Sequence, residues 1–172
     1  TEFLLDELQL ELSEEKTLIT HASSQAARLL GYEIVAQHCD SKLDRHRTRS
    51  TNAVMALRLP PAVVKERCSR FKRDGTIMHR PELLAEHDHD IVQLYQWEYA
   101  GLVTYYRLAQ NVCWLNTLQW VMQISLLKTL ANKHKTSVRK IWTKHRSTCG
   151  TEHGPRRCVE VVVPRPGKPP LT

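Results

Sequence analysis

The chain has 172 residues, of which 41% are hydrophobic and 25% are charged, and its formal net charge is +7 at pH 7. This length can bury one core, or one core with a small addition, and argues against two full domains. The sequence shows no apolar run of membrane-spanning length, no signal peptide and no framework for its five cysteines, so we expect an intracellular protein that has no contact with a membrane.

The first 38 residues predict a short helix followed by strands. Residues 1–12 carry leucines on one helical face and acidic side chains on the other. Residues 16–21 and 26–35 alternate apolar and polar side chains, which predicts two strands that can pair as an antiparallel hairpin. Because an isolated hairpin is only marginally stable in water, we expect this one to pack against other parts of the protein.

Residues 37–51 are polar, carry both charges and have almost nothing to bury. This composition predicts a linker or a mobile loop, with an arginine-rich, phosphate-contacting arm as the alternative to a simple solvated loop. Residues 53–59 predict a short strand that ends at two prolines. Pro61 suits the first turn of a helix, which we expect to have a basic face and to stop at Asp74 and Gly75.

Three further helices are predicted between residues 88 and 145, and we expect them to surround one core. Asp88 suits the N-cap of the first helix. In the second, apolar and small residues recur at three-and-four spacing, which predicts one buried face. That face comprises Leu115, Leu118, Met122, Ser125 or Leu126, and Thr129 or Leu130, and it is broadened by Trp114, Val121, Ile124 and Leu127. Thr136 and Ser137 supply hydroxyl caps for the third helix, which turns Val138, Ile141 and Trp142 inward.

The region after these helices is expected to have little regular structure. Residues 147–155 predict a turn-rich connection, residues 157–163 a strand, and the proline-rich end an irregular segment.

The charges of the helical region have one sign, because no Asp or Glu occurs between Glu98 and Glu152. A surface of this kind attracts polyanions, so we expect nucleic acid as the ligand. The alternative is a merely soluble basic bundle whose aromatic residues form its core. The expected RNA-binding residues are Arg107, Lys128, Lys133, His134, Lys135, Arg139, Lys140 and Lys144.

Several motifs occur in order along the chain. They are His79-Arg80-Pro81-Glu82-Leu83, Tyr105-Tyr106, Leu115-Asn116 and the run from Lys128 to Ser137. This set resembles domain X, the thumb, of group II intron-encoded reverse transcriptases (maturases). Upstream, residues 12–17 resemble the end of the reverse-transcriptase palm, and Leu29-Leu30-Gly31-Tyr32 resembles its primer-grip hairpin. The chain departs from that family at Leu29, where Phe is usual, at Ala53, where Gly is usual, and at Ala100, where Arg is common.

The resemblance implies a mainly α fold, with a three-helix thumb-like bundle, a small N-terminal antiparallel β-hairpin from the palm end and a short C-terminal β segment. It divides the chain into the end of the palm, a basic linker, domain X and a C-terminal turn, strand and proline-rich tail. The ranges are 1–38, 39–59, 60–148 and 149–172.

The implied function is binding of group II intron RNA, which assists splicing, and clamping of an RNA/DNA template–primer duplex in the intact protein. The same resemblance is compatible with a homodimer. It implies a location in the bacterial cytoplasm, with an organelle as the alternative. The alternative is a truncated or degenerate fragment, a helical module without RNA activity of its own.

The catalytic chemistry of such polymerases is not contained in this sequence. Intact members hold Mg²⁺ on the aspartates of a Tyr-Ala-Asp-Asp motif, and this motif does not occur here. We therefore expect no cofactor in this chain. We also expect that it does not polymerise DNA by itself, unless another chain supplies the aspartates. The resemblance implies a primer-grip role for Leu30, Gly31 and Tyr32. It also makes Lys16 a candidate for a position near the leaving pyrophosphate, with an exposed strand lysine as the alternative.

We also expect no metal site, although four residues near the C-terminus have loosely zinc-like spacing. They are His145, Cys149, His153 and Cys158.

Overall fold

The computed structural model describes residues 6–9, 19–21, 24–43, 45–49, 51–151, 154–165 and 168–171. The chain divides into two compact units, Thr1–Arg58 and Leu59–Thr172. Helices predominate and the strands form small antiparallel sheets, which confirms a mainly α fold with β-hairpins. Within the described ranges, no helix combines the length and the apolar character that crossing a bilayer requires.

The first unit contains a three-stranded antiparallel sheet of β1 (Ala27–Leu29), β2 (Tyr32–Ala36) and β3 (Met55–Arg58), in that order. The prediction of one strand over residues 26–35 was wrong, because the chain turns in the middle of that stretch. Leu30 and Gly31 both have positive φ, 48° and 76°, as a two-residue hairpin turn requires. The strand predicted over residues 16–21 falls mostly outside the described residues.

The polar stretch after β2 is a loop and not a linker, because β3 returns to pair with β2. The Asn52 side chain closes this loop by accepting a hydrogen bond from the Cys39 backbone at 2.7 Å and donating one to Asp40 at 3.2 Å. Ala53 follows with a φ of 65°, a conformation that suits glycine better than a residue with a Cβ atom. The strand predicted over residues 53–59 is confirmed as β3.

The second unit begins with α2 (Pro61–Ser69), whose first turn contains Pro61 as predicted. The helix ends earlier than expected. Asp74 and Gly75, with φ of 50° and 75°, form the turn between β4 (Lys72–Arg73) and β5 (Thr76–Ile77), so they do not stop the helix. A two-residue Asp-Gly turn is a strong hairpin signal, and the sequence prediction missed it.

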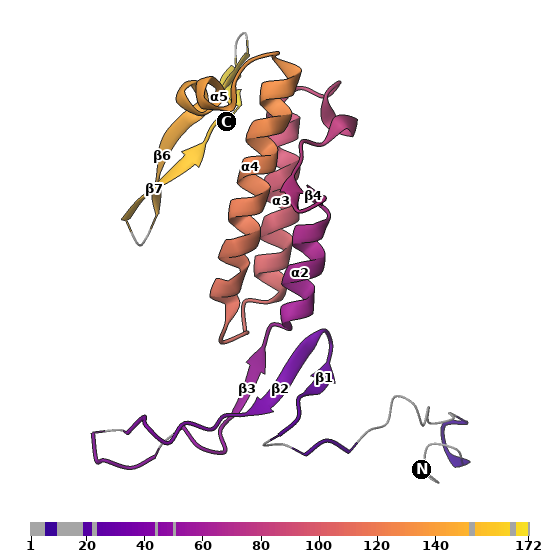
Figure 1. The fold of residues 1–172 in the computed structure, drawn as a ribbon, viewed down its shortest axis with the longest axis vertical. Helices are drawn as coiled ribbons and strands as arrows, with labels where there is room; N and C mark the ends of the chain where they lie inside the picture. The colour runs from indigo at the N-terminus through magenta and orange to yellow at the C-terminus, as the bar shows by residue number, and fades with distance from the viewer. Residues whose placement is uncertain are drawn as a thin grey trace. The chain divides into compact units, whose positions relative to one another are not determined.

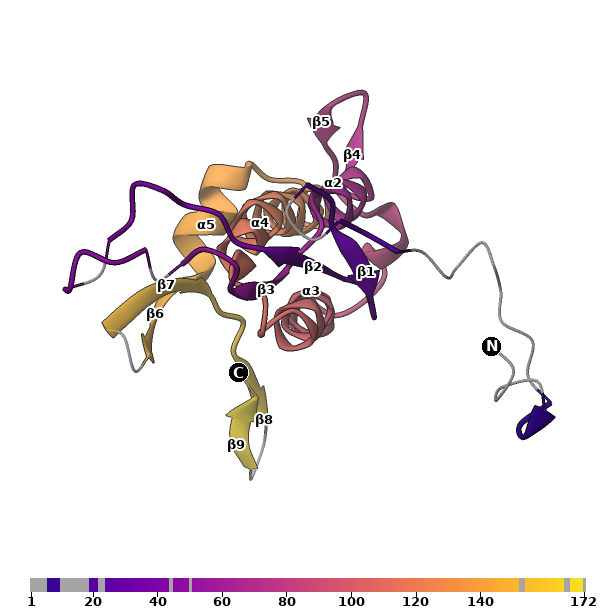
Figure 2. The same ribbon diagram turned by 90° about the horizontal axis from the view of Figure 1, so that it is seen from below.

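The core of this unit lies along α4 (Leu115–Lys133), which contacts α2 and α3 (Asp88–Tyr105). These three helices lie side by side (Figure 1), and Figure 2 shows them end-on. The predicted buried face is confirmed. Its members are Leu115, Leu118, Met122, Ser125, Leu126, Thr129 and Leu130, each at most 7% exposed. Trp114, which was expected to broaden this face, is 39% exposed. The apolar members of this face stabilise the second unit by roughly 25 cal/mol per Å² of apolar surface that they bury.

The bundle differs from the expected trio, since α2 and not α5 (Val138–His145) lies alongside α3 and α4. The helix α5 instead packs against α4 near the C-terminal end of α4 (Figure 1), with Ile141 buried. Its N-cap is Ser137, as predicted, whose hydroxyl accepts a hydrogen bond from the Lys140 backbone at 3.3 Å.

Two short 3-10 helices lie beside the bundle. They are η2 (Pro81–Leu83), which precedes α3, and η3 (Val112–Trp114), which leads into α4. The side chain of Asn111, just before η3, accepts a hydrogen bond from the Leu59 backbone at 2.7 Å and donates one back at 3.0 Å. This pair of bonds fixes the start of the second unit against the N-terminal end of α4.

The region after α5 is more regular than predicted. The hairpin of β6 (Arg146–Thr151) and β7 (Gly154–Val159) occupies the expected turn-rich connection, and the proline-rich end contains β8 (Val163–Arg165) and β9 (Lys168–Leu171). A disulfide joins Cys149 of β6 to Cys158 of β7, contrary to the expectation of unpaired cysteines.

Candidate nucleic-acid interface

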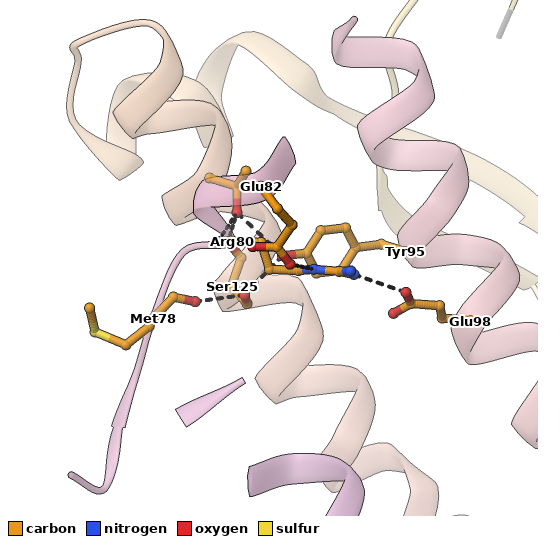
Figure 3. Close-up of polar contacts among 7 residues, drawn as sticks. Met78, Arg80, Glu82, Tyr95, Glu98 and Ser125 are labelled. Carbon is orange, nitrogen blue, oxygen red and sulfur yellow. Dashed lines mark hydrogen bonds and ion pairs between the residues drawn. The ribbon is translucent and has the colours of Figure 1, made fainter. Parts of the chain in front are cut away.

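A buried polar cluster holds α3, α4 and the segment after β5 together (Figure 3). The Tyr95 hydroxyl lies 2.9 Å from Ser125 Oγ and 3.2 Å from Thr129 Oγ1. Ser125 donates to the Met78 carbonyl at 2.6 Å. Burial raises the pKa of Tyr95, which keeps the phenol neutral. Because buried polar groups are costly without partners, this cluster fixes the segment around Met78 against both helices.

Arg80 is the charged part of this arrangement, and its charge is directed inward. Its backbone donates to Thr129 Oγ1 at 3.0 Å, and its guanidinium contacts Glu82 at 2.8 Å and Glu98 at 2.9 Å. The same guanidinium lies 5.4 Å from the centre of the Tyr95 ring. Burial opposes the charge, but the two carboxylates outweigh it and raise the pKa of Arg80. Arg80 therefore has a positioning role.

Two of the predicted RNA-binding residues are paired with an acid. Lys133 Nζ lies 2.7 Å from Asp88 Oδ1, and His134 Nε2 lies 2.6 Å from Asp88 Oδ2. Lys133 also donates to the Glu86 carbonyl. Burial acts to raise the pKa of Asp88, but the hydrogen bonds from Lys133 and His134 outweigh it and lower that pKa. Asp88 is not the N-cap of α3, a position that His87 occupies; it joins the start of α3 to the end of α4.

Lys128 is also engaged in the fold. Its ammonium group donates to the Ile77 carbonyl at 2.6 Å and is partly buried there. This contact fixes β5 against α4, so the ammonium is only partly available to an external phosphate. The sequence could not reveal these engagements because the partners are 45 to 51 residues away along the chain.

The four remaining predicted cations near α5 are exposed and have no ion pair among the described residues. We define them as the α5 cationic surface: Lys135, Arg139, Lys140 and Lys144. On α5, Arg139 and Lys140 lie away from the buried Ile141 and His145, and Lys144 lies at the edge of the buried side. Arg139 and Lys140 lie in the first turn of α5, which contains no acidic residue.

Lys135 connects α4 to α5 in a left-handed conformation, with a φ of 49°. The Thr136 backbone donates to the Ala131 carbonyl at 2.9 Å, and the Lys135 backbone donates to the Asn132 carbonyl at 3.3 Å. This is a Schellman motif with lysine at the position where glycine is usual. The motif ends α4 and directs the chain into α5, so it positions the α5 cationic surface.

The structure does not bring Arg107 into this surface. Arg107 follows the C-terminal end of α3, at the opposite end of the bundle from α5 (Figure 1). The 19 residues of α4 lie between the two ends, a distance of about 28 Å at 1.5 Å per residue.

The palm-like residues belong to the first unit or lie outside the description. Leu30 and Gly31 form the exposed turn between β1 and β2, and Tyr32 begins β2. Lys16 lies outside the described residues, so its role stays a prediction.

Three arginines of the β6–β7 hairpin were not predicted as RNA-binding residues. Arg146, Arg156 and Arg157 are exposed, and none has an ion pair in the described part of the chain. The Arg156-Arg157 pair was visible in the sequence, but that stretch was interpreted as a turn and a strand of unknown placement. Arg146 follows α5 directly, whereas Arg157 of β7 lines a cavity beside α3 and α4.

Aromatic residues contribute little to the exposed surface near α5. Tyr106 is 6% exposed and belongs to the core, as expected, and Trp142 is half-buried. Tyr105 is 53% exposed but lies at the other end of the bundle, where its ring contacts Tyr106 at 4.8 Å.

The residues with zinc-like spacing do not form a cluster of ligands. Cys149 and Cys158 are joined to each other, and His145 Nδ1 lies 3.2 Å from the Glu160 carbonyl. His153 lies outside the described residues. Over the described ranges, no group of three or more His, Cys, Asp or Glu side chains could hold a metal ion.

Comparison with known proteins places the chain among intron maturases. A family model described as type II intron maturase matches residues 64–150, which extend from α2 to β6. The group II intron-encoded protein LtrA of Lactococcus lactis subsp. cremoris is 36% identical over 148 residues, 80% of this chain and 24% of LtrA. Maturase K proteins of Chara globularis and Chara connivens are 29% identical over 73 residues, 42% of this chain and 14% of each relative.

The chain thus spans about a quarter of the length of LtrA. These matches do not favour the alternative of an inert helical module. Because the family model covers half of the sequence, including every helix that positions the α5 cationic surface, the chain belongs to the type II intron maturase family.

Proposed function

We propose that residues 59–172 form an RNA-binding region that holds group II intron RNA on the α5 cationic surface. In the intact protein, this binding stabilises the folded intron during splicing. The RNA carries out the splicing chemistry, and the protein favours its active conformation by binding that conformation more tightly than unfolded ones.

The observation that carries this proposal is the charge at the start of α5. A helix N-terminus favours acidic side chains, because its backbone N–H groups carry a partial positive charge. Here Arg139 and Lys140 occupy the first turn, and Lys135 lies just before it. This arrangement costs stability in the free protein and becomes favourable when a phosphate group is bound.

Some cations of the helical region are excluded because acidic side chains pair with them, whereas Lys65 and Lys72 on α2 and β4 are exposed and a control variant tests them. Arg80 is paired with Glu82 and Glu98, and Lys133 with Asp88. In contrast, the exposed cations of α5 and of the β6–β7 hairpin have no acidic partner among the described residues. Phosphate contacts by such residues give affinity that falls with salt.

The family resemblance supports finer assignments for the intact protein. We propose that the β1–β3 sheet belongs to the end of a palm, with Leu30, Gly31 and Tyr32 at a primer grip. Residues 60–148 then act as a thumb that clamps the template–primer duplex. Such a polymerase would use Mg²⁺ on the aspartates of a Tyr-Ala-Asp-Asp motif, and the contribution that we propose for these 172 residues is binding.

A variant with Lys135, Arg139 and Lys140 changed to alanine tests the location of the RNA. We expect weaker binding to group II intron RNA in filter-binding assays, and a slope of log affinity against log salt that is shallower by about 2 to 3, because each phosphate contact contributes roughly 0.7 to 0.9.

The matched control changes Lys65, Lys72 and Arg73, three exposed cations, and so removes the same charge from α2 and β4. We expect this control to lose much less affinity. Equal losses in both variants would show that net charge, and not the α5 cationic surface, determines binding.

A further inference from the structure

A cavity of about 510 Å³ opens between α3, α4 and the chain around β7. Four glutamine side chains line it, Gln93 and Gln96 from α3 and Gln119 and Gln123 from α4. The β6–β7 hairpin forms the remaining wall and lies on the other side of α4 from α2 (Figure 1, Figure 2). The volume is in the range of pockets that bind small organic groups.

The glutamine amides are not used by the fold. Gln93 and Gln123 are half-buried, Gln96 and Gln119 are exposed, and none of the four has a hydrogen-bond partner among the described residues. All four amides are therefore accessible to a ligand in the cavity that they line. Because each amide can both donate and accept, the lining suits a ligand with several donors and acceptors.

The other lining groups narrow the chemistry of that ligand. Tyr99 offers an aromatic ring, and burial raises its pKa, so its hydroxyl stays neutral. Arg157 contributes a guanidinium and Glu160 a carboxylate, and neither has an ion pair in the described part of the chain. Amides that can donate and accept, beside an aromatic ring and a guanidinium, suit a flat, hydrogen-bonding group attached to a phosphate.

We propose that this cavity receives an unpaired base of the bound RNA, with the base edge toward Gln93 and Gln123 and the adjoining phosphate toward Arg157. This inference rests on the proposed RNA-binding function and deepens it. Specific RNA recognition uses unpaired bases, because the base edges of an RNA duplex are hard to reach. The Glu160 carboxylate accepts hydrogen bonds only and so selects bases with an exocyclic amino group.

The position of the cavity is consistent with one RNA molecule that contacts both the cavity and the α5 cationic surface. Arg157 lies on β7, and the hairpin that contains it begins directly after α5. An RNA duplex on the α5 cationic surface therefore has its neighbouring unpaired nucleotides close to the hairpin. In this arrangement, contacts with the phosphates of the duplex provide affinity, and contacts with the base in the cavity distinguish one RNA sequence from another.

The test compares two RNA hairpins that differ only in a short unpaired adenosine bulge, with affinities measured by fluorescence anisotropy. The wild-type chain should prefer the bulged RNA by about tenfold, since one stacked and hydrogen-bonded base contributes roughly 1 to 3 kcal/mol. The Gln93→Ala/Gln123→Ala variant should lose this preference and keep its affinity for the paired hairpin. Alanine is a better helix former than glutamine, so both helices remain stable.

Gln110→Ala is the matched control, because Gln110 is exposed and does not line the cavity. It should keep the wild-type preference. If the wild type binds both RNAs equally, or if the double variant keeps the preference, the proposal that the cavity receives a base is contradicted, while the proposed RNA-binding function is not. Failure of the wild type to bind either RNA contradicts the proposed function, and the cavity inference with it.

Discussion

Lys135 combines a strained backbone with a charge that the proposed function needs. Its φ of 49° places it in the left-handed region, which costs a residue with a Cβ atom about 1 kcal/mol relative to glycine. Ala53 has the same feature in the first unit, with a φ of 65°. The family usually has glycine at the position of Ala53. At Lys135, the positive charge gives a reason why a residue that is less favourable than glycine in this conformation occurs there.

Lys135→Gly should raise the free energy of unfolding by about 0.5 to 1 kcal/mol, because the Schellman motif is then formed without strain. The same variant should bind RNA less tightly, since one phosphate contact is lost. Urea unfolding and RNA binding measure the two effects. Lys135→Ala is the control, because it removes the charge and keeps the strain. A Lys135→Gly variant no more stable than Lys135→Ala contradicts this interpretation.

At the scale of secondary-structure elements, α3 and α4 are joined at one end by Asp88, which pairs with Lys133 and His134. The pKa of Asp88 is lowered, because the hydrogen bonds from its partners outweigh its burial. A carboxyl group whose pKa is lower in the folded state stabilises the fold above its unfolded-state pKa. That stabilisation is lost as the pH falls through the folded-state pKa.

Asp88→Asn should therefore lower the free energy of unfolding by about 1 to 3 kcal/mol near neutral pH, through the loss of charge-assisted hydrogen bonds and of an acid in the first turn of α3. The difference from wild type should shrink as the pH falls below about 4, the usual pKa of an aspartate. Urea unfolding of the variant and the wild type, near neutral pH and again below about pH 4, measures this difference. An equal difference at the two pH values would show that the pair contributes through packing and not through charge.

The elements that the sequence predicted well are those with a repeated local pattern. The buried face of α4 follows from three-and-four spacing, although the spacing left Ser125 or Leu126 and Thr129 or Leu130 as alternatives, and all four are buried. The early end of α2 and the β4–β5 turn were missed because the Asp-Gly signal was interpreted as a helix stop. The β6–β7 hairpin was missed because its residues do not alternate between apolar and polar side chains.

At the scale of the whole molecule, the sequence showed the sign of the charge but not its distribution. The acid-free interval correctly indicated a basic region. It could not show that Asp88, more than 40 residues upstream, neutralises Lys133 and His134, or that Arg107 lies at the far end of the bundle. Contacts between distant residues leave no periodic trace, so the candidate interface could be narrowed from eight residues to the four of the α5 cationic surface only with the structure.

The most direct test is the charge reversal Arg139→Glu/Lys140→Glu, with RNA binding and thermal unfolding measured on the same protein. Acidic residues in the first turn of α5 favour the helix, so the melting temperature should stay the same or rise. Affinity for intron RNA should fall more than tenfold at low salt, because two phosphate contacts become repulsive. A folded variant that binds the RNA as tightly as the wild type would contradict the account.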